Sequence, residues 1–403
     1  MQIPPELYSL TISLPSWALL GAMLLIMITI AAILWPKLLR VRREVRRDNA
    51  QTADIASSAI AFPPVSVIVY SQADGVNLRT LLPQILNQDY PAPMEVIVVN
   101  DESSDDTETI VTELEMKYSN LYMTFAPENS RNLSRRKLAI TLGIKAARYD
   151  SLLLTCGNCR ISSPLWMRSM MRHMAAGKEV VIGYATEAAT DAAADTDRRR
   201  RRRAFDNLWE SVRFLSAAIC GHPLRATGFN LAYTRRLFFD HKGFSRTLNL
   251  QYRDDDIFIN EIATGANTAV ELSDDSRVIA TNHSPARIHD IYRLRRDFTA
   301  RRLPRTAYRS MGLTSALQWL WPVCGVAASL LALPSLIVAA GALLLTILFL
   351  ALNSMMWRRT AIALGVRPMR WATPWLSWTR PFRTLRHRIR GFRSRHLNLT
   401  FSA

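Results

Sequence analysis

An uncharged run near the start of the chain, from Trp17 to Trp35, limits what this sequence can fold into more than any other feature. As a helix with about 1.5 Å rise per residue it would span roughly 28 Å, close to the ~30 Å hydrocarbon core of a bilayer. A tryptophan stands at each end, where interfacial aromatic residues are common. A signal peptide would need a basic region before the run and a small-residue cleavage site after it, and neither is present. The run therefore predicts a transmembrane helix within residues 1–50.

Basic residues beside the apolar stretches predict the orientation. Six follow the first run, from Lys37 to Arg47, and the tail over 358–403 carries eleven arginines and no acidic residue. A second apolar stretch, Leu317 to Trp357, is interrupted by proline and serine near its middle, which predicts a transmembrane hairpin over 313–357. By the positive-inside rule, we expect a multi-pass protein of the inner (cytoplasmic) membrane with its soluble part in the cytoplasm.

The net charge of +18 could indicate a nucleic-acid partner. However, the basic residues gather beside the apolar stretches and among Trp357, Trp371, Trp375 and Trp378. Attraction to anionic lipid headgroups explains this arrangement better, so we expect anionic lipids as partners and no nucleic acid. The four cysteines do not suggest a disulfide framework for a cytoplasmic domain.

Short apolar runs alternate with amphipathic stretches from Val65 onward, which is typical of βα units on a parallel sheet. Such sheets bind ligands at the carboxyl ends of their strands. We expect strands at 65–70, 94–100, 121–126, 151–155 and 179–184, and helices at 77–87, 106–118 and 134–148.

The region after the last of these strands is less regular. The Ala/Asp-rich stretch 185–197 reads as a loose surface loop, and six arginines follow at 198–203. These arginines are explained either by a solvated face or by an amphipathic helix that contacts the membrane. Arginines also recur over 286–312, which we expect to form a basic interfacial helix.

Three motifs appear in order in the first half of this region: Val65-Ser-Val-Ile-Val, Gln88-Asp-Tyr-Pro, and Val96-Ile-Val-Val-Asn-Asp-Glu-Ser-Ser-Asp-Asp-Thr. Together they resemble the opening of membrane-bound family 2 glycosyltransferases, and the resemblance extends over about 65–310. It implies a Rossmann-like nucleotide-sugar-binding domain of the GT-A type, at 61–285, between one N-terminal and two C-terminal transmembrane helices. It also implies sugar transfer from a nucleotide-sugar donor, with inversion at the anomeric carbon.

The resemblance assigns roles to individual residues. In this family the carboxylate after the second strand contacts the nucleotide, which carries over to Asp101, with Glu102 and Ser103 beside it. A carboxylate at a strand's carboxyl end can accept charge-assisted hydrogen bonds from base N–H groups and sugar hydroxyls. The ordinary alternative is that Asp101 and its neighbours form only a turn and a helix cap. Lys137 lies in a helix similar to the family's Gly-Lys-x-x-Ala helix, and we expect it in the donor site.

Two later segments continue the resemblance. Gly228-Phe-Asn-Leu-Ala-Tyr is similar to the strand near the acceptor, so Gly228, Asn230 and the upstream aromatic Trp166 are candidates for acceptor binding. Arg253-Asp-Asp-Asp-Ile-Phe resembles the segment that carries the catalytic base. Clustered carboxylates raise one another's pKa, which suits a general base. We expect Asp255 to be the base, flanked by Asp254 and Asp256; the alternative is an acidic helix start favoured by the helix dipole.

The sequence also departs from the family at its metal site. Where the family has Asp-x-Asp, this chain has Cys156-Gly157-Asn158, so both carboxylates are absent. Mg²⁺ and Mn²⁺ prefer charged oxygen ligands, and Asn158 offers one amide oxygen. A divalent cation is therefore possible but doubtful as a cofactor.

Three functional hypotheses follow. The first is an active enzyme of envelope glycan synthesis in which arginines such as Arg135, Arg295 or Arg296 neutralise the diphosphate, with a lipid-linked or other membrane acceptor. The second is a catalytically degenerate partner or scaffold in a membrane polysaccharide complex. The third takes Cys156-Gly-Asn-Cys159 as a thioredoxin-like redox site.

Overall fold

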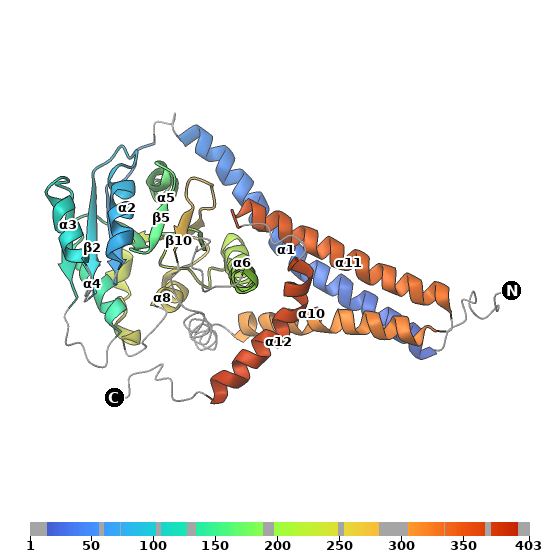
Figure 1. Ribbon diagram of the computed structural model, residues 1–403. Helices are drawn as coiled ribbons and strands as arrows, with labels where there is room; N and C mark the ends of the chain where they lie inside the picture. Colours follow the sequence, from blue (N-terminus) through green and yellow to red (C-terminus); the bar gives the residue numbers. More distant parts are fainter. Residues whose placement is uncertain are drawn as a thin grey trace.

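The computed structural model describes residues 14–55, 60–72, 74–101, 106–126, 134–187, 197–248, 254–281, 305–333, 335–366 and 372–393. An α/β domain lies at one end of the molecule, and a bundle of long helices extends away from it (Figure 1).

The bundle consists of helix α1 (Leu14–Ile55) and the pair α10 (Arg305–Leu331) and α11 (Leu336–Ala363). Two consecutive helices, α10 and α11, occupy the region over which the transmembrane hairpin was predicted, and their passage through a membrane stays a prediction. By length and composition α1, over Leu14–Thr52, and α11 could each cross a membrane, whereas the apolar part of α10, Ala316–Leu331, is shorter.

Small and polar residues allow the three helices to approach closely. A Cβ added at Gly325 of α10 would lie 2.5 Å from Thr346 Oγ1 of α11, so this contact requires a glycine. The hydroxyl of Ser16 on α1 donates to the carbonyl of Leu331 at 2.7 Å. Many leucines, including Leu25 and Leu344, point outward and are exposed. A surface with so many exposed apolar side chains suits a lipid environment.

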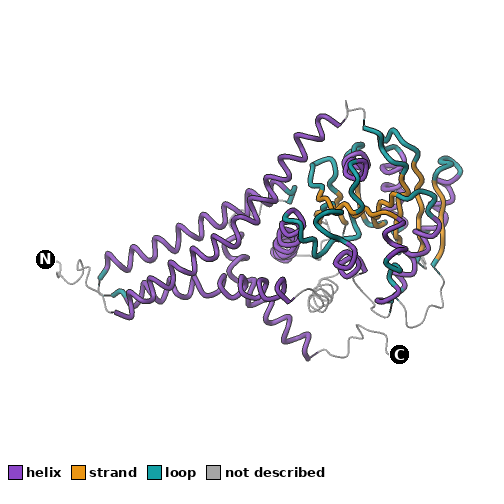
Figure 2. The backbone as a smooth tube through the Cα atoms, turned by 180° about the vertical axis from the view of Figure 1, so that it is seen from behind, coloured by secondary structure: helices purple, strands orange, loops and turns teal. Residues whose placement is uncertain are grey.

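The domain is built on a seven-stranded mixed sheet in the order β3-β2-β1-β4-β8-β6-β9. Strands β1 to β4 run parallel, while β8 is antiparallel to both of its neighbours, β4 and β6. Every residue of β1 is buried, because helices cover both faces of the sheet (Figure 2). The strands are β1 (Val65–Ser71), β2 (Met94–Asn100), β3 (Leu121–Phe125), β4 (Ser151–Cys156), β6 (Val180–Ile182), β8 (Leu231–Thr234) and β9 (Thr268–Val270).

The five predicted strands and three predicted helices are confirmed within a few residues. The helices are α2 (Gly75–Leu86), α3 (Thr107–Glu115) and α4 (Arg135–Ala146). They are followed by α5 (Trp166–Ala175), α6 (Asp197–Ile219), α7 (Arg235–Asp240), the 3-10 turn η2 (Ser245–Thr247), α8 (Asp254–Ile262) and α12 (Ala372–Arg393).

A second, three-stranded sheet was not predicted. It has the order β5 (Cys159–Ile161), β10 (Val278–Ala280) and β7 (Ala185–Glu187). The interpretation of 185–197 as loop throughout is wrong at its start, because Ala185–Glu187 pairs with β10 and buries Thr186. The predicted interfacial helix over 286–312 lies outside the described residues up to Arg305, where α10 begins.

Candidate functional site

The carboxyl ends of β1, β2 and β4 meet at one edge of the sheet, because these strands are parallel and in register. Ser71 pairs with Asn100 of β2, and Tyr70 pairs with Cys156 of β4. Two backbone bonds continue the ladder past the strands: Asp101 N–H donates to Ser71 at 2.9 Å, and Gly157 N–H donates to Tyr70 at 2.8 Å. The loops after these strands therefore start side by side, at the edge where such sheets bind ligands.

Asp101 lies at the centre of this edge and is almost completely buried. The Tyr70 hydroxyl donates to its Oδ2 at 2.6 Å, and Arg135 Nε donates to its Oδ1 at 2.9 Å. Burial raises the pKa of the Tyr70 phenol, and its bond to Asp101 raises it further, although the nearby Arg136 opposes the shift. The phenol therefore stays protonated and keeps donating, which fixes the orientation of the carboxylate.

A second arginine from the first turn of α4 lies against the same strand ends. The Arg136 guanidinium stacks 4.7 Å from the centre of the Tyr70 ring, and its Nη2 donates to Cys156 Sγ at 3.4 Å. Ser134 caps this helix by accepting from the backbone N–H of Lys137. The first turn of α4 thus brings two guanidinium groups to the edge that carries Asp101.

Lys137 makes a different contact from the one expected. Its side chain is fully buried, and its ammonium donates to the backbone carbonyl of Thr247. The carbonyl of the next residue, Leu248, accepts from Ser134 N–H at 2.9 Å. These contacts tie the start of α4 to the segment that leads into α8. A direct contact between Lys137 and a nucleotide stays a prediction.

Helix α8 begins at Asp254, as the acidic triplet suggested. Asp256 is the member of the acidic triplet whose side chain the structure describes. It is buried, and its Oδ2 lies 3.5 Å from Nε of Arg225, which is equally buried. The side chains of Asp254 and Asp255 lie outside that description, as do the residues Glu102 and Ser103. Their roles therefore stay predictions.

The residues that we expected to bind the sugar acceptor are buried inside the domain. Trp166 and Asn230 are both fully buried, and the indole N–H donates to Asn230 Oδ1 at 3.1 Å. The Asn230 amide in turn donates to the carbonyls of Tyr184 and Ser276, at 3.1 and 2.7 Å. The carbonyl of Gly228 accepts from the Cys156 thiol. These bonds join the main sheet to the loop before β10, so any acceptor contact through Trp166 or Asn230 stays a prediction.

The altered metal loop has a specific geometry around Gly157. A Cβ at this position would lie 2.9 Å from Asp74 Cβ, 3.1 Å from Asp74 Oδ2 and 3.2 Å from Ser71 Oγ, so no side chain fits. The Ser71 hydroxyl is buried and, among the described residues, makes no hydrogen bond. The Asn158 carbonyl accepts from the N–H and hydroxyl of Thr281, at 2.7 and 2.6 Å. Oxygen atoms that could bind a cation therefore lie beside this loop, although the two carboxylates that the family has in the loop are missing.

The two cysteines of this loop do not resemble a redox pair. Cys156 and Cys159 are reduced thiols, and both are buried. Burial raises the pKa of the Cys159 thiol, and the neighbouring Cys156 raises it further. Redox catalysis needs an accessible thiol with a lowered pKa. This geometry disfavours the redox hypothesis.

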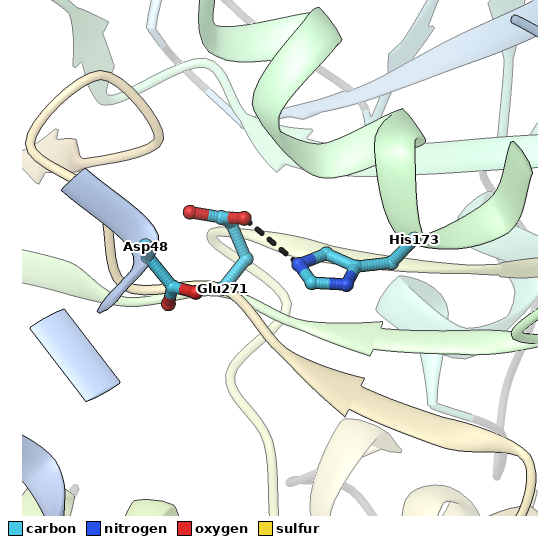
Figure 3. Close-up of side chains that lie close together, drawn as sticks. All are labelled: Asp48, His173 and Glu271. Carbon is cyan, nitrogen blue, oxygen red and sulfur yellow. Dashed lines mark hydrogen bonds and ion pairs between the residues drawn. The ribbon is translucent and has the colours of Figure 1, made fainter. Parts of the chain in front are cut away.

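A further charged cluster, not expected from the sequence, joins α1 to the domain. Asp48, His173 and Glu271 offer ligand atoms within 4.8 Å of one another (Figure 3). The guanidinium of Arg172 supplies the positive charge that balances these carboxylates, because its Nη2 lies 2.9 Å from Asp48 Oδ1 and 2.6 Å from Glu271 Oε2. Backbone N–H groups of Leu272 and Ser273 bind the other two carboxylate oxygens, both at 2.9 Å. We interpret the cluster as a structural clamp. It had no distinctive sequence signal, because Asp48 is one of two acidic residues, with Glu44, in a basic stretch.

Comparisons with known proteins agree with this architecture. Residues 65–246 match the family model described as glycosyl transferase family 2. A mannosyltransferase from Pyrobaculum calidifontis, solved with GDP-Man and Mn²⁺, is similar in structure, with a TM-score of 0.51 and 20% identity over 89% of this chain and 99% of that one. S. aureus TarS with UDP aligns with a TM-score of 0.39 and 19% identity, over 63% of this chain and 65% of TarS. No curated protein matches this chain by sequence.

Proposed function

We propose that this chain, whose residues 65–246 match the glycosyl transferase family 2 model within an α/β domain of the GT-A fold, moves a sugar from a nucleotide-sugar donor to an acceptor held at a membrane. The reaction would be a single displacement with inversion at the anomeric carbon. The catalytic domain would comprise about 61–285.

The observation that carries this proposal is the buried Asp101 carboxylate at the carboxyl end of β2, oriented by Tyr70 and Arg135. Each carboxylate oxygen keeps acceptor capacity for a second donor, such as a base N–H or a ribose hydroxyl. Glu102 and Ser103, directly after it, would complete the nucleoside contact. The bonds from Lys137 Nζ to the Thr247 carbonyl and from Ser134 N–H to the Leu248 carbonyl support a shared site with the acidic segment that follows.

Two tasks remain for the protein in sugar transfer. A general base must take the proton of the acceptor hydroxyl, and positive charge must stabilise the departing nucleoside diphosphate. Asp255 is our candidate base, with Asp254 and Asp256 beside it. Arg135 and Arg136 stand at the edge of the sheet and would supply positive charge by bidentate bonds to phosphate.

Some of the oxygen ligands that a divalent cation needs are present at this site. Asp74, Ser71 and Asn158 would bind it: Asp74 Oδ2 and Ser71 Oγ both lie within 3.2 Å of the place where a Cβ of Gly157 would stand, and Asn158 is the next residue. When bound, Mg²⁺ or Mn²⁺ would stabilise negative charge on the leaving diphosphate. The structural neighbour from Pyrobaculum contains Mn²⁺ with GDP-Man.

We further propose that α1, α10 and α11 are three transmembrane spans and that the domain faces the cytoplasm. The exposed leucines of the bundle and the basic residues after Trp35 support this topology. A lipid-linked acceptor suits a catalytic domain that is held next to the bilayer, and anionic lipids would attract the basic tail over 358–403.

A coupled nucleotide-release assay on the full chain tests the activity. With GDP-mannose and a set of UDP-sugars as donors, we expect turnover that falls by about 10²-fold or more in Asp255→Ala, because a general base contributes that much. Asp240→Ala, an exposed aspartate at the end of α7, is the control and should retain the rate.

The absence of the family's two metal carboxylates favours one alternative, a binding partner without turnover. Folded protein that binds nucleotide sugars but releases no nucleotide with any donor, in the presence of lipid extracts as acceptor, would support that alternative and contradict the enzyme.

A further inference from the structure

Helix α12 has two faces of opposite character. Trp375, Phe382, Leu385 and Ile389 recur every three to seven residues and form one stripe, in which each side chain is between 45% and 58% exposed. The ring of Phe382 contacts that of Trp319 on α10 at a centroid distance of 5.2 Å. The stripe is therefore continuous with the apolar surface of the helical bundle.

The opposite face of α12 is bound to α6 by buried ion pairs. Arg380 Nη2 lies 2.7 Å from Glu210 Oε1, and its guanidinium stacks 4.4 Å from the Trp209 ring. One turn later, Arg383 Nη2 lies 3.2 Å from Asp206 Oδ1. Trp209 itself stacks on Trp357 at the end of α11. Because these contacts fix the rotation of α12 about its axis, its apolar stripe is held facing outward.

Charge and position indicate what covers the stripe. Between Ala372 and Arg393 the helix carries six arginines and no acidic residue. Figure 1 shows α12 leaving the bundle beside α10, at the end nearer the domain. An apolar stripe flanked by arginines at the end of apolar spans matches the chemistry of an interfacial helix on anionic lipid. We propose that α12 is a lipid-interface helix whose exposed stripe inserts among the headgroups of anionic phospholipids.

The inward face of α12 continues toward the acidic segment of the domain. Glu210, which binds Arg380, also lies 4.0 Å from Arg225 Nη1, and Arg225 Nε lies 3.5 Å from Asp256 Oδ2. Glu210, Arg225 and Asp256 have at most 15% of their side chains exposed, so solvent screens their interactions little. Insertion of the stripe would therefore be coupled to the position of α8. This coupling rests on the proposed function, whereas the insertion itself does not.

Insertion can be measured without turnover. The full chain, with Cys220→Ser and Cys324→Ala to remove the more accessible thiols, is reconstituted in nanodiscs that contain phosphatidylglycerol. A single environment-sensitive probe is attached at Leu385→Cys or, as control, at Met116→Cys, an exposed apolar position after α3 on the domain. Quenching is recorded with nitroxide-labelled lipid acyl chains and with aqueous iodide.

The expected result is opposite behaviour of the two probes. Acyl-chain nitroxide should quench the Leu385 probe about threefold or more better than the Met116 probe, and iodide should do the reverse. Replacement of phosphatidylglycerol by phosphatidylcholine should reduce lipid quenching at position 385. Equal access of iodide to both probes would contradict the proposal. Protection from iodide without lipid quenching would also contradict it, because a protein or a second copy would then cover the stripe.

Coupling is tested with the double variant Leu385→Gln/Ile389→Gln, which changes two exposed side chains of the stripe. Nucleotide release by the wild type should be faster in anionic than in zwitterionic nanodiscs, and this difference should disappear in the variant. An unchanged difference would contradict coupling. If no turnover occurs in any lipid, the proposed function fails, while the quenching result still decides whether α12 inserts.

Discussion

Arg135 Nε lies 2.9 Å from Asp101 Oδ1, and the two side chains differ sharply in exposure. The carboxylate is 1% exposed, whereas the guanidinium is 30% exposed. The cation of this pair therefore reaches the surface at the edge of the sheet, while the anion is held in place behind it. An incoming diphosphate would meet Arg135 first, and the nucleoside would meet a carboxylate of fixed orientation.

Asp101→Asn should weaken the binding of nucleoside diphosphate by about tenfold or more, because the amide cannot replace a charge-assisted acceptor. Isothermal titration of the detergent-solubilised chain measures this. Asp89→Asn, at an exposed aspartate paired with Arg168, is the matched control and should bind as the wild type does. Unchanged affinity in Asp101→Asn, with the protein still folded, would separate Asp101 from the donor site.

Gly157→Ala should impair nucleotide binding without unfolding the domain. The added Cβ would meet Asp74 Cβ at 2.9 Å, so the loop after β1 or the loop after β4 must move. Such overpacking costs about 1–3 kcal/mol, which lowers the melting temperature by several degrees. Differential scanning fluorimetry and nucleotide titration together test this; Gly341→Ala on α11, where the added Cβ meets nothing within 4 Å and the backbone is helical, controls for the loss of a glycine. Wild-type melting and binding in Gly157→Ala would contradict the geometry.

Asn158→Asp should strengthen the binding of Mn²⁺ in the presence of nucleoside diphosphate, because it restores one charged oxygen ligand at the altered metal loop. Titration followed by electron paramagnetic resonance reports free Mn²⁺ directly. Asn87→Asp, on the exposed end of α2, controls for the added charge. If both variants take up Mn²⁺ as the wild type does, Asn158 is not near the cation.

Arg172→Met should destabilise the protein strongly, because it leaves Asp48 and Glu271 buried without their shared cation. Breaking a buried pair in this way costs about 3–5 kcal/mol. Arg168→Met, on the same helix, removes a pair with the exposed Asp89 and should cost about 1 kcal/mol or less. Equal thermal stability of the two variants would show that the cluster does not clamp α1 to the domain.

The same cluster predicts a dependence on acidity. Burial alone would raise the pKa of Glu271, but the hydrogen bond from His173 and the charge of Arg172 outweigh it, so the pKa is lowered from its usual 4.5. A lowered pKa contributes stability that is present above pH 4.5 and is lost as the pH falls through the folded-state value. Thermal melts of wild type and Glu271→Gln should therefore converge in strong acid. A constant difference across that range would contradict the assignment.

The local elements of this fold could be predicted because their signals lie within short windows. Val65–Ser71 is a mostly apolar run, and α2 places Leu78, Leu81, Leu82 and Ile85 on one buried face. The small sheet of β5, β7 and β10 could not be predicted. Each of its strands has three residues, and its pairings join residues more than ninety positions apart, such as Val278 with Ala185 and with Ile161.

The candidate site, too, could be predicted from the sequence only in part. Asp101 could be located from the sequence, because a carboxylate after a buried strand must lie at the ligand-binding edge of the sheet. Its partners Tyr70 and Arg135 could not be assigned, since they come from other elements 31 and 34 residues away. Trp166 and Asn230 were predicted to bind the acceptor, yet their polar groups bind each other and nearby carbonyls. Motif similarity gave their positions but not the direction of their side chains.

The most direct test of a donor site at this edge is a structure of the full chain soaked with nucleoside diphosphate and Mn²⁺. We expect base and ribose density within hydrogen-bonding distance of Asp101 and diphosphate density between Arg135 and Asn158. Nucleotide bound elsewhere, with the edge of β1, β2 and β4 unoccupied at saturating concentration, would contradict it.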